Sequence, residues 1–118
     1  LEFRKLPDDS DPDEENNETT VYPGIGHTVN ISGGGVLFIT KYEIKMEELL
    51  ELRMNLPKRR NLITRARPVR IEPVEMYGEK RHAVAVCFEG IKESDRDAIV
   101  AFIFERQREL LKRGLDRR

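Results

Sequence analysis

The chain has few of the residue types that carry redox, metal or nucleophilic chemistry. Its 118 residues include one cysteine, two histidines and no tryptophan. A single Cys87 excludes an internal disulfide framework and fits a reducing compartment. No cysteine or carboxylate completes a metal-ligand spacing around His27 or His82, and we find no nucleophile–base pair and no Gly-Lys-Ser/Thr phosphate loop. We therefore expect a protein that is not an enzyme and that needs no metal or cofactor.

Long apolar runs are also missing. No stretch approaches the length of a membrane span, and the first residues do not have the pattern of a signal peptide. We expect a cytoplasmic protein that does not insert into a membrane. The length suits one domain, residues 1–118. Because the sequence begins directly in a strand-like segment, residues 1–6, we expect this domain to be excised from a longer protein.

The charge is distributed unevenly. Residues 8–18 contain seven acidic side chains and no basic one, although the net charge of the whole chain is only −1. The other residues therefore carry a net charge of +6, which suits an anionic partner, although a solvated basic surface is the commoner meaning. We expect the acidic stretch, residues 7–18, to be a flexible loop, because it lacks large apolar side chains.

Alternating apolar residues predict a sheet. The clearest strand is residues 50–56, in which every second side chain is apolar. Further strands are predicted at residues 1–6, 19–22, 28–31, 36–41, 62–74 and 82–88. Pro68 within residues 62–74 indicates a bulge or an edge position, and Cys87 is interpreted as a small, semi-buried side chain. About six antiparallel strands closed into a barrel would leave few edges exposed.

The C-terminal part has the pattern of a helix, at residues 93–113. Ser94 and Asp97 have the spacing of a capping box at its start. An apolar stripe at helical spacing, made of Ile99, Phe102, Ile103 and Leu110, is predicted to pack on the barrel. The sequence thus predicts an all-β domain with one C-terminal helix.

The most informative segment is the run Asn30-Ile31-Ser32-Gly33-Gly34-Gly35, which lies between two strand-like segments. Its composition predicts a turn, and three successive glycines allow positive φ and close approach of a bound molecule. Asn30 and Ser32 are two residues apart, so they point to the same side if the strand continues through them. Their other interpretation is an Asx or Ser turn that closes a hairpin.

This run resembles the (Asp/Asn)-x-Ser-x-x-Gly signature of PilZ domains, which are bacterial receptors for the second messenger cyclic di-GMP. The strand at residues 49–57, the basic strand ending at residue 74, the strand at residues 83–88 and the helix around residues 99–107 follow in the family's order. The resemblance implies a six-stranded antiparallel PilZ-type split β-barrel, most like the C-terminal domain of flagellar-brake-type proteins that regulate motility.

The resemblance also implies a ligand site. It assigns cyclic di-GMP binding to Asn30, Ser32 and Gly35, with smaller contributions from Gly33 and Gly34. The family carries an Arg-x-x-x-Arg motif upstream, and here Arg4 corresponds to its second arginine, while the first would precede Leu1. A guanidinium can bind a phosphate or a guanine edge through two hydrogen bonds. We expect an N-terminal arm that bears Arg4 to order over the nucleotide and to relay the signal to another domain or protein.

Two other functions remain open. The domain could be a PilZ-like protein-interaction adapter that does not bind nucleotide. It could also be a plain oligonucleotide-binding barrel, but few aromatic side chains accompany the basic cluster, so no nucleic-acid partner is expected. That cluster comprises Lys58, Arg59, Arg60, Arg65, Arg67 and Arg70. It could steer the dinucleotide, meet an acidic partner or form a solvated outer surface.

Overall fold

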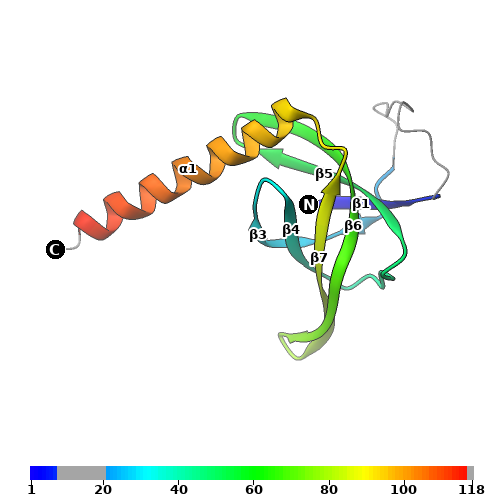
Figure 1. Cartoon of the computed structure of the whole chain (residues 1–118). Helices are drawn as coiled ribbons and strands as arrows, with labels where there is room; N and C mark the ends of the chain where they lie inside the picture. The colour runs from blue at the N-terminus through cyan, green and yellow to red at the C-terminus, as the bar shows by residue number, and fades with distance from the viewer. Residues whose placement is uncertain (8–20, 117–118) are drawn as a thin grey trace.

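One antiparallel sheet and one helix make up the described part of the chain. The structure is a computed structural model that describes residues 1–7 and 21–116. The elements are β1 (Glu2–Leu6), β2 (Gly24–Ile25), β3 (His27–Ile31), β4 (Gly35–Thr40), β5 (Leu49–Leu56), β6 (Arg59–Met76), β7 (Glu79–Glu89) and α1 (Glu93–Asp116). The seven strands of these ranges form a single sheet in the order β2-β1-β5-β6-β7-β4-β3 (Figure 1).

The sheet curls so strongly that its two edge strands come close together. β2 and β3 lie at opposite ends of the strand order, yet only Gly26 separates them in sequence. The edges must therefore approach within the reach of about two peptide units, roughly 7 Å. The Gly26 N–H donates to the Leu1 carbonyl oxygen at 2.8 Å, and the Thr40 hydroxyl donates to the Ile25 carbonyl oxygen at 2.7 Å. These bonds hold the corner at which the two edges meet.

The sheet differs from the predicted six-stranded barrel. Within the described residues there are seven strands, and no ladder joins β2 to β3, so the sheet is open. The additional strand is β2, which lies between the strands predicted at residues 19–22 and 28–31 and pairs with β1. Residues 21 and 22 are not in a strand, and the rest of the strand predicted at residues 19–22 lies outside the described residues. So do residues 8–18, which hold most of the predicted acidic loop.

The concave side of the sheet contains the main core. Leu50 and Leu52 of β5 are fully buried, which confirms the predicted alternation. They pack with Phe3 of β1 and Phe38 of β4, whose ring centroids are 5.6 Å apart. The other buried members are Val36, Ile44, Ala66, Val84 and Val86. Apolar burial of this kind contributes on the order of 2 kcal/mol for each large side chain.

A second core cluster attaches the helix. Ile99 of α1 is fully buried against Met54, Leu56 and Leu62 at one end of β5 and β6. The helix is therefore anchored through its N-terminal half.

The long strand β6 contains the predicted bulge. Its pairing with β7 shifts register between Pro68 and Arg70, which confirms this prediction.

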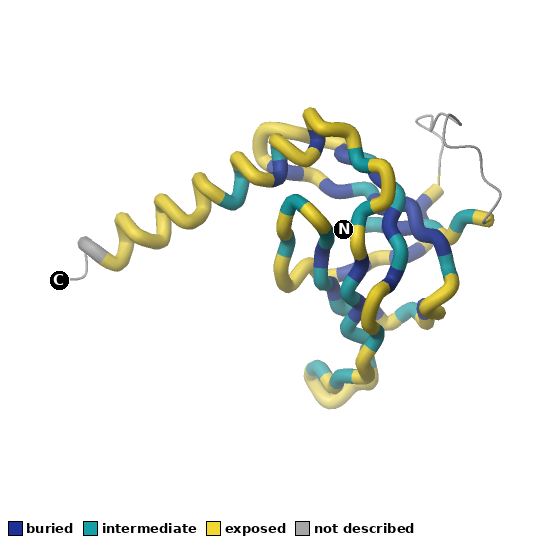
Figure 2. Tube along the Cα trace, in the orientation of Figure 1, coloured by how far each residue is buried: buried dark blue, intermediate teal, exposed yellow. Residues whose placement is uncertain are grey.

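The helix start and the apolar stripe differ in part from the predictions. The Lys92 carbonyl oxygen accepts hydrogen bonds from the N–H groups of Asp95 and Arg96, so the helix begins at Glu93 and Ser94 is in its first turn rather than at the cap. Phe102 and Ile103 pack partly on the second core cluster, but Leu110 is 58 % exposed. The stripe fails at Leu110 because the sheet ends before it, and this half of α1 projects into solvent (Figure 2).

Candidate functional site

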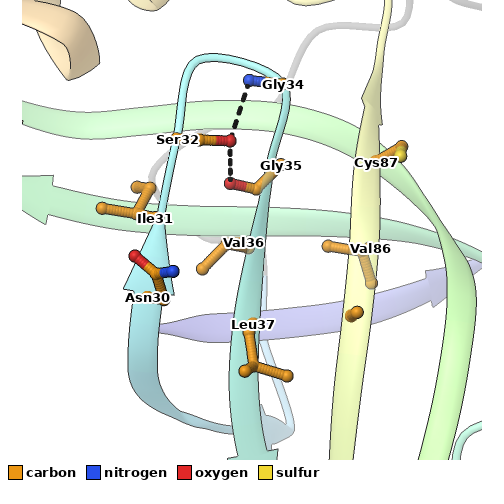
Figure 3. Close-up of a pocket in the computed structure, with 10 residues that line it drawn as sticks. Asn30, Ile31, Ser32, Gly34, Gly35, Val36, Leu37, Val86 and Cys87 are labelled. Atoms are coloured by element: carbon orange, nitrogen blue, oxygen red, sulfur yellow. Dashed lines mark hydrogen bonds between the residues drawn. The ribbon is translucent and has the colours of Figure 1, made fainter.

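The turn between β3 and β4 is closed by its own serine. The Ser32 N–H donates to the Gly35 carbonyl oxygen at 2.9 Å, and the Gly34 N–H donates to the Ser32 hydroxyl oxygen at 3.2 Å. The same hydroxyl also donates to the Gly35 carbonyl oxygen at 3.4 Å (Figure 3). The predicted turn is confirmed, and Ser32 performs the turn-closing role that was the other interpretation of this residue.

None of the three glycines has a positive φ, and close approach requires glycine only at Gly35. A Cβ at Gly35 would lie 2.0 Å from the Val86 carbonyl oxygen, so β4 and β7 can pair here only with glycine at this position. The Gly34 carbonyl oxygen accepts from the Phe88 N–H at 2.9 Å, which fastens the turn to the end of β7.

A shallow, open pocket of about 360 Å³ lies beside this turn. Four of the sequence-predicted site residues line it, and Figure 3 shows them around the ends of β3 and β4: Asn30, Ser32, Gly34 and Gly35. The remaining lining comes from Ile31, Val36, Leu37, Ala85, Val86 and Cys87. Among the residues that the structure describes, those that line the pocket include no charged side chain.

Cys87 is a pocket residue that the sequence reasoning missed. Its side chain is exposed, so the prediction of a semi-buried cysteine is wrong. Val84 and Val86 point into the core, and the alternation of β7 therefore places Cys87 on the outer face, directly opposite Gly35 of β4. The exposure of Cys87 could have been predicted from the sequence, because the alternation of side chains along residues 82–88 puts Cys87 on the side opposite to those valines.

Arg4 does not line the pocket. It lies on β1 opposite Glu51 of β5, and its Nε donates to the Glu51 carboxylate at 2.8 Å. The Tyr22 hydroxyl donates to the same carboxylate oxygen, also at 2.8 Å. Burial, together with this hydrogen bond to Glu51, raises the pKa of Tyr22 to about 12. The guanidinium of Arg53 covers the Tyr22 ring at 4.4 Å from its centroid. Arg4 thus belongs to a separate polar cluster.

Several members of the basic cluster bind acidic side chains. Arg59 donates two hydrogen bonds to the buried Asp95 carboxylate, at 3.0 and 2.8 Å, and so fastens the β5–β6 turn to α1. Lys58 donates to Glu105 at 2.7 Å, which lowers the pKa of that carboxyl group. Arg67 donates to Glu89 at 2.7 Å. The cluster therefore holds the helix and the strands as well as contributing surface charge.

Comparison with known proteins decides the family. The model of the PilZ domain family matches residues 6–105, which is most of the chain. The chain belongs to the PilZ family. PilZ domains are generally cyclic di-GMP receptors rather than catalysts, and some members lack nucleotide binding. The match includes the turn and the pocket, whereas Arg4 precedes it. Neither the search of curated proteins nor that of solved structures found a match.

In residues 1–7 and 21–116, no helix is long and apolar enough to span a bilayer. The same residues contain no group of three or more histidine, cysteine, aspartate or glutamate side chains placed to hold a metal ion.

Proposed function

We propose that this PilZ domain binds cyclic di-GMP in the pocket beside the β3–β4 turn. One observation carries the proposal: the three signature positions Asn30, Ser32 and Gly35 all line the same open pocket. Its volume lies within the range of small-ligand sites, which is roughly 300 to 1,000 Å³. The pocket is mostly apolar, with a few polar groups at one side, as expected for a site that receives a nucleobase and orients it by hydrogen bonds.

The chemistry of the lining suits a guanine nucleotide. The Asn30 amide both donates and accepts hydrogen bonds, as does the edge of guanine. The Ser32 hydroxyl already accepts from the Gly34 N–H, but an exposed hydroxyl oxygen has a further lone pair for a ligand donor. Leu37 and Ala85 supply an apolar surface for the base or ribose. Gly35 supports the site by allowing β4 to lie close to β7.

A ligand role for Arg4 competes with its contact in the structure. Its Nε is bound to the Glu51 carboxylate at 2.8 Å, and Arg4 is not among the residues that line the pocket. Ordering of residues 1–6 over the nucleotide is also disfavoured, because β1 already pairs with a strand on both sides and Phe3 is only 2 % exposed. We therefore propose that the signal leaves through the β3–β4 turn and its neighbours rather than through ordering of this arm. Arg4→Ala should then change nucleotide affinity less than Asn30→Ala.

The output of such a receptor would be a changed surface for a protein partner or an adjoining domain. Binding energy drives this change only if the ligand prefers one of two states of the domain. We propose a bacterial, cytoplasmic signalling role, with motility regulation as the output that the flagellar-brake resemblance favours.

The alternative function is an adapter that does not bind nucleotide. The observation that favours it is the uncharged lining of the pocket, because cyclic di-GMP carries two phosphate charges that a site must solvate or pair. Under this alternative, the signature residues only close the turn, as Ser32 does.

Calorimetric titration separates the two functions. Cyclic di-GMP should give saturable heat with the wild type, and GMP should not. Asn30→Ala should weaken binding about tenfold, as expected for the loss of one or two hydrogen bonds of ~1 kcal/mol each. His27→Ala is the matched control, since it changes an exposed residue of the same strand outside the pocket.

The single thiol gives an independent measurement. Because Cys87 lines the pocket, bound cyclic di-GMP should slow its alkylation in the wild type and have little effect in Asn30→Ala at the same concentration. A flat titration with an unchanged alkylation rate would favour the adapter.

A further inference from the structure

The β3–β4 turn packs directly against the first turns of α1. A Cβ at Gly33 would lie 3.4 Å from Cγ2 of Val100 and 3.5 Å from Cγ of Arg96. Gly33 is flanked by Ser32 and Gly34, which both line the pocket. The stem of the Arg96 side chain therefore lies over the tip of the turn, at the rim of the proposed ligand site.

The pocket needs a cation that its own lining does not provide. Arg67 is opposite Cys87 on the neighbouring strand, but it binds the Glu89 carboxylate at 2.7 Å. Arg96 is exposed, and in the described part of the chain it makes no ion pair. The Cδ atom of Arg96 lies 3.9 Å from the position that a Cβ of Gly33 would occupy, and the terminal guanidinium nitrogens extend about three bonds beyond Cδ. The guanidinium can thus reach a ligand that projects from the pocket past the turn.

We propose that Arg96 of α1 binds a phosphate of cyclic di-GMP and forms the third side of the site, beside the β3–β4 turn and the outer face of β7. This inference rests on the proposed function. A guanidinium presents two parallel N–H donors to phosphate oxygens, so arginine suits this position better than lysine. Two carboxylates, Glu93 and Asp97, are close to Arg96 in sequence on the same helix and reduce the local positive charge. The ligand phosphate must compete with them, which makes the contact sensitive to ionic strength.

The contact would also join the ligand to the helix. A phosphate bound by Arg96, with its base held by Asn30, would bridge α1 and the strand pair β3–β4. Occupancy of the site would thereby fix the position of α1 relative to the sheet. This gives the proposed signal a route that does not require β1 to detach.

The test compares cyclic di-GMP binding by the wild type, Arg96→Gln, Arg96→Lys and Arg108→Gln. Arg96→Gln should weaken binding about tenfold, because a charge-assisted bidentate contact is lost. Arg96→Lys should bind with intermediate affinity. Arg108→Gln, an equivalent change on the exposed part of the same helix, should bind like the wild type. Thermal unfolding of the four proteins should coincide, since neither arginine is buried.

The salt dependence gives a readout that a structural role would not change. Raising the ionic strength should weaken wild-type binding more steeply than that of Arg96→Gln, which lacks the exposed charge contact. If the wild type binds and Arg96→Gln binds equally well with the same salt dependence, this inference is wrong while the proposed function stands. If the wild type does not bind cyclic di-GMP, both are wrong.

Discussion

Gly35 has no room for a side chain, because a Cβ there would lie 2.0 Å from the Val86 carbonyl oxygen. That oxygen belongs to the backbone of β7 and cannot move without disturbing the β4–β7 ladder. Gly34, the next residue along the turn, has only the Ser32 hydroxyl near the same position, at 4.0 Å. Two adjacent glycines of one motif thus have different physical roles.

We predict that Gly35→Ala lowers the free energy of unfolding by about 2 kcal/mol, as expected for overpacking against a rigid neighbour. Gly34→Ala should change it by less than about 0.5 kcal/mol. Chemical denaturation followed by circular dichroism measures both values. Equal stability of the two variants would show that β4 and β7 do not approach as closely as described.

The buried phenol of Tyr22 couples stability to alkaline pH. Burial and the hydrogen bond to Glu51 raise the pKa of Tyr22 from 10.0 to about 12 in the folded state. The folded state therefore holds the phenolic proton more tightly than the unfolded state does. The contribution of the protonated Tyr22 phenol to the free energy of unfolding is fully present below pH 10 and is lost as the pH rises through about 12.

We predict that the denaturant concentration at which the wild type is half unfolded decreases as the pH is raised from 10 to 12. Tyr22→Phe removes the titrating group, so its midpoint should be lower at neutral pH and should fall less steeply over the same interval. Tyr77→Phe, at a phenol that is 97 % exposed, is the control. The prediction fails if Tyr22→Phe keeps the full alkaline slope.

At the scale of elements, α1 consists of two halves with different environments. The first half is held by the buried Ile99 and by the two hydrogen bonds from Arg59 to Asp95. The second half contacts little of the sheet, and Phe104, Leu110 and Leu111 are 62 %, 58 % and 70 % exposed. An isolated helical segment of that length is marginally stable in water.

Amide hydrogen exchange should therefore show a gradient along α1. Amides of residues 97–103 should be protected, and those of residues 108–113 should exchange much faster, because local opening there breaks no tertiary contact. Exchange measured at several protein concentrations checks whether association covers the exposed apolar side chains. Uniform protection of the whole helix at low concentration would contradict this description.

The predictable features were those with a local cause. Leu50 and Leu52 alternate with polar residues, and Pro68 cannot donate to a ladder, so β5 and the β6 bulge followed from the sequence. The Asn30-to-Gly35 turn followed from its glycines. The partners of Arg4 did not, because the pairing of β1 with β5 joins residues 47 apart in sequence. The β2 strand and the Gly26 corner likewise depend on the closure of the entire sheet.

The shape of the whole molecule is extended by α1. The Cα radius of gyration is 15.6 Å, and the principal extents are 54 × 38 × 25 Å. A compact chain of this length would have a radius of gyration of roughly 13.5 Å. The projecting half of the helix provides a direct explanation for the difference (Figure 1).

Small-angle X-ray scattering should detect this extension. We predict that a variant truncated after Gln107 has a smaller radius of gyration than the wild type, by more than its loss of mass alone requires, while its unfolding free energy is nearly unchanged. Phe104→Ser is a control that keeps the length of the helix. Equal radii for the wild type and the truncated variant would mean that the tail folds back onto the sheet in solution.

The anchoring of α1 near one end makes the helix a lever. Ile99 is the last fully buried residue among the described side chains of α1, and it serves as a pivot. The helix continues for about 25 Å beyond it, whereas Arg96 lies only about 4.5 Å before it along the axis. A tilt of roughly 10° about the pivot moves Arg96 by less than ~1 Å but moves the far end by ~4 Å. A rigid tilt of this kind would thus amplify a sub-ångström adjustment beside the pocket about sixfold at the C-terminal end of the helix.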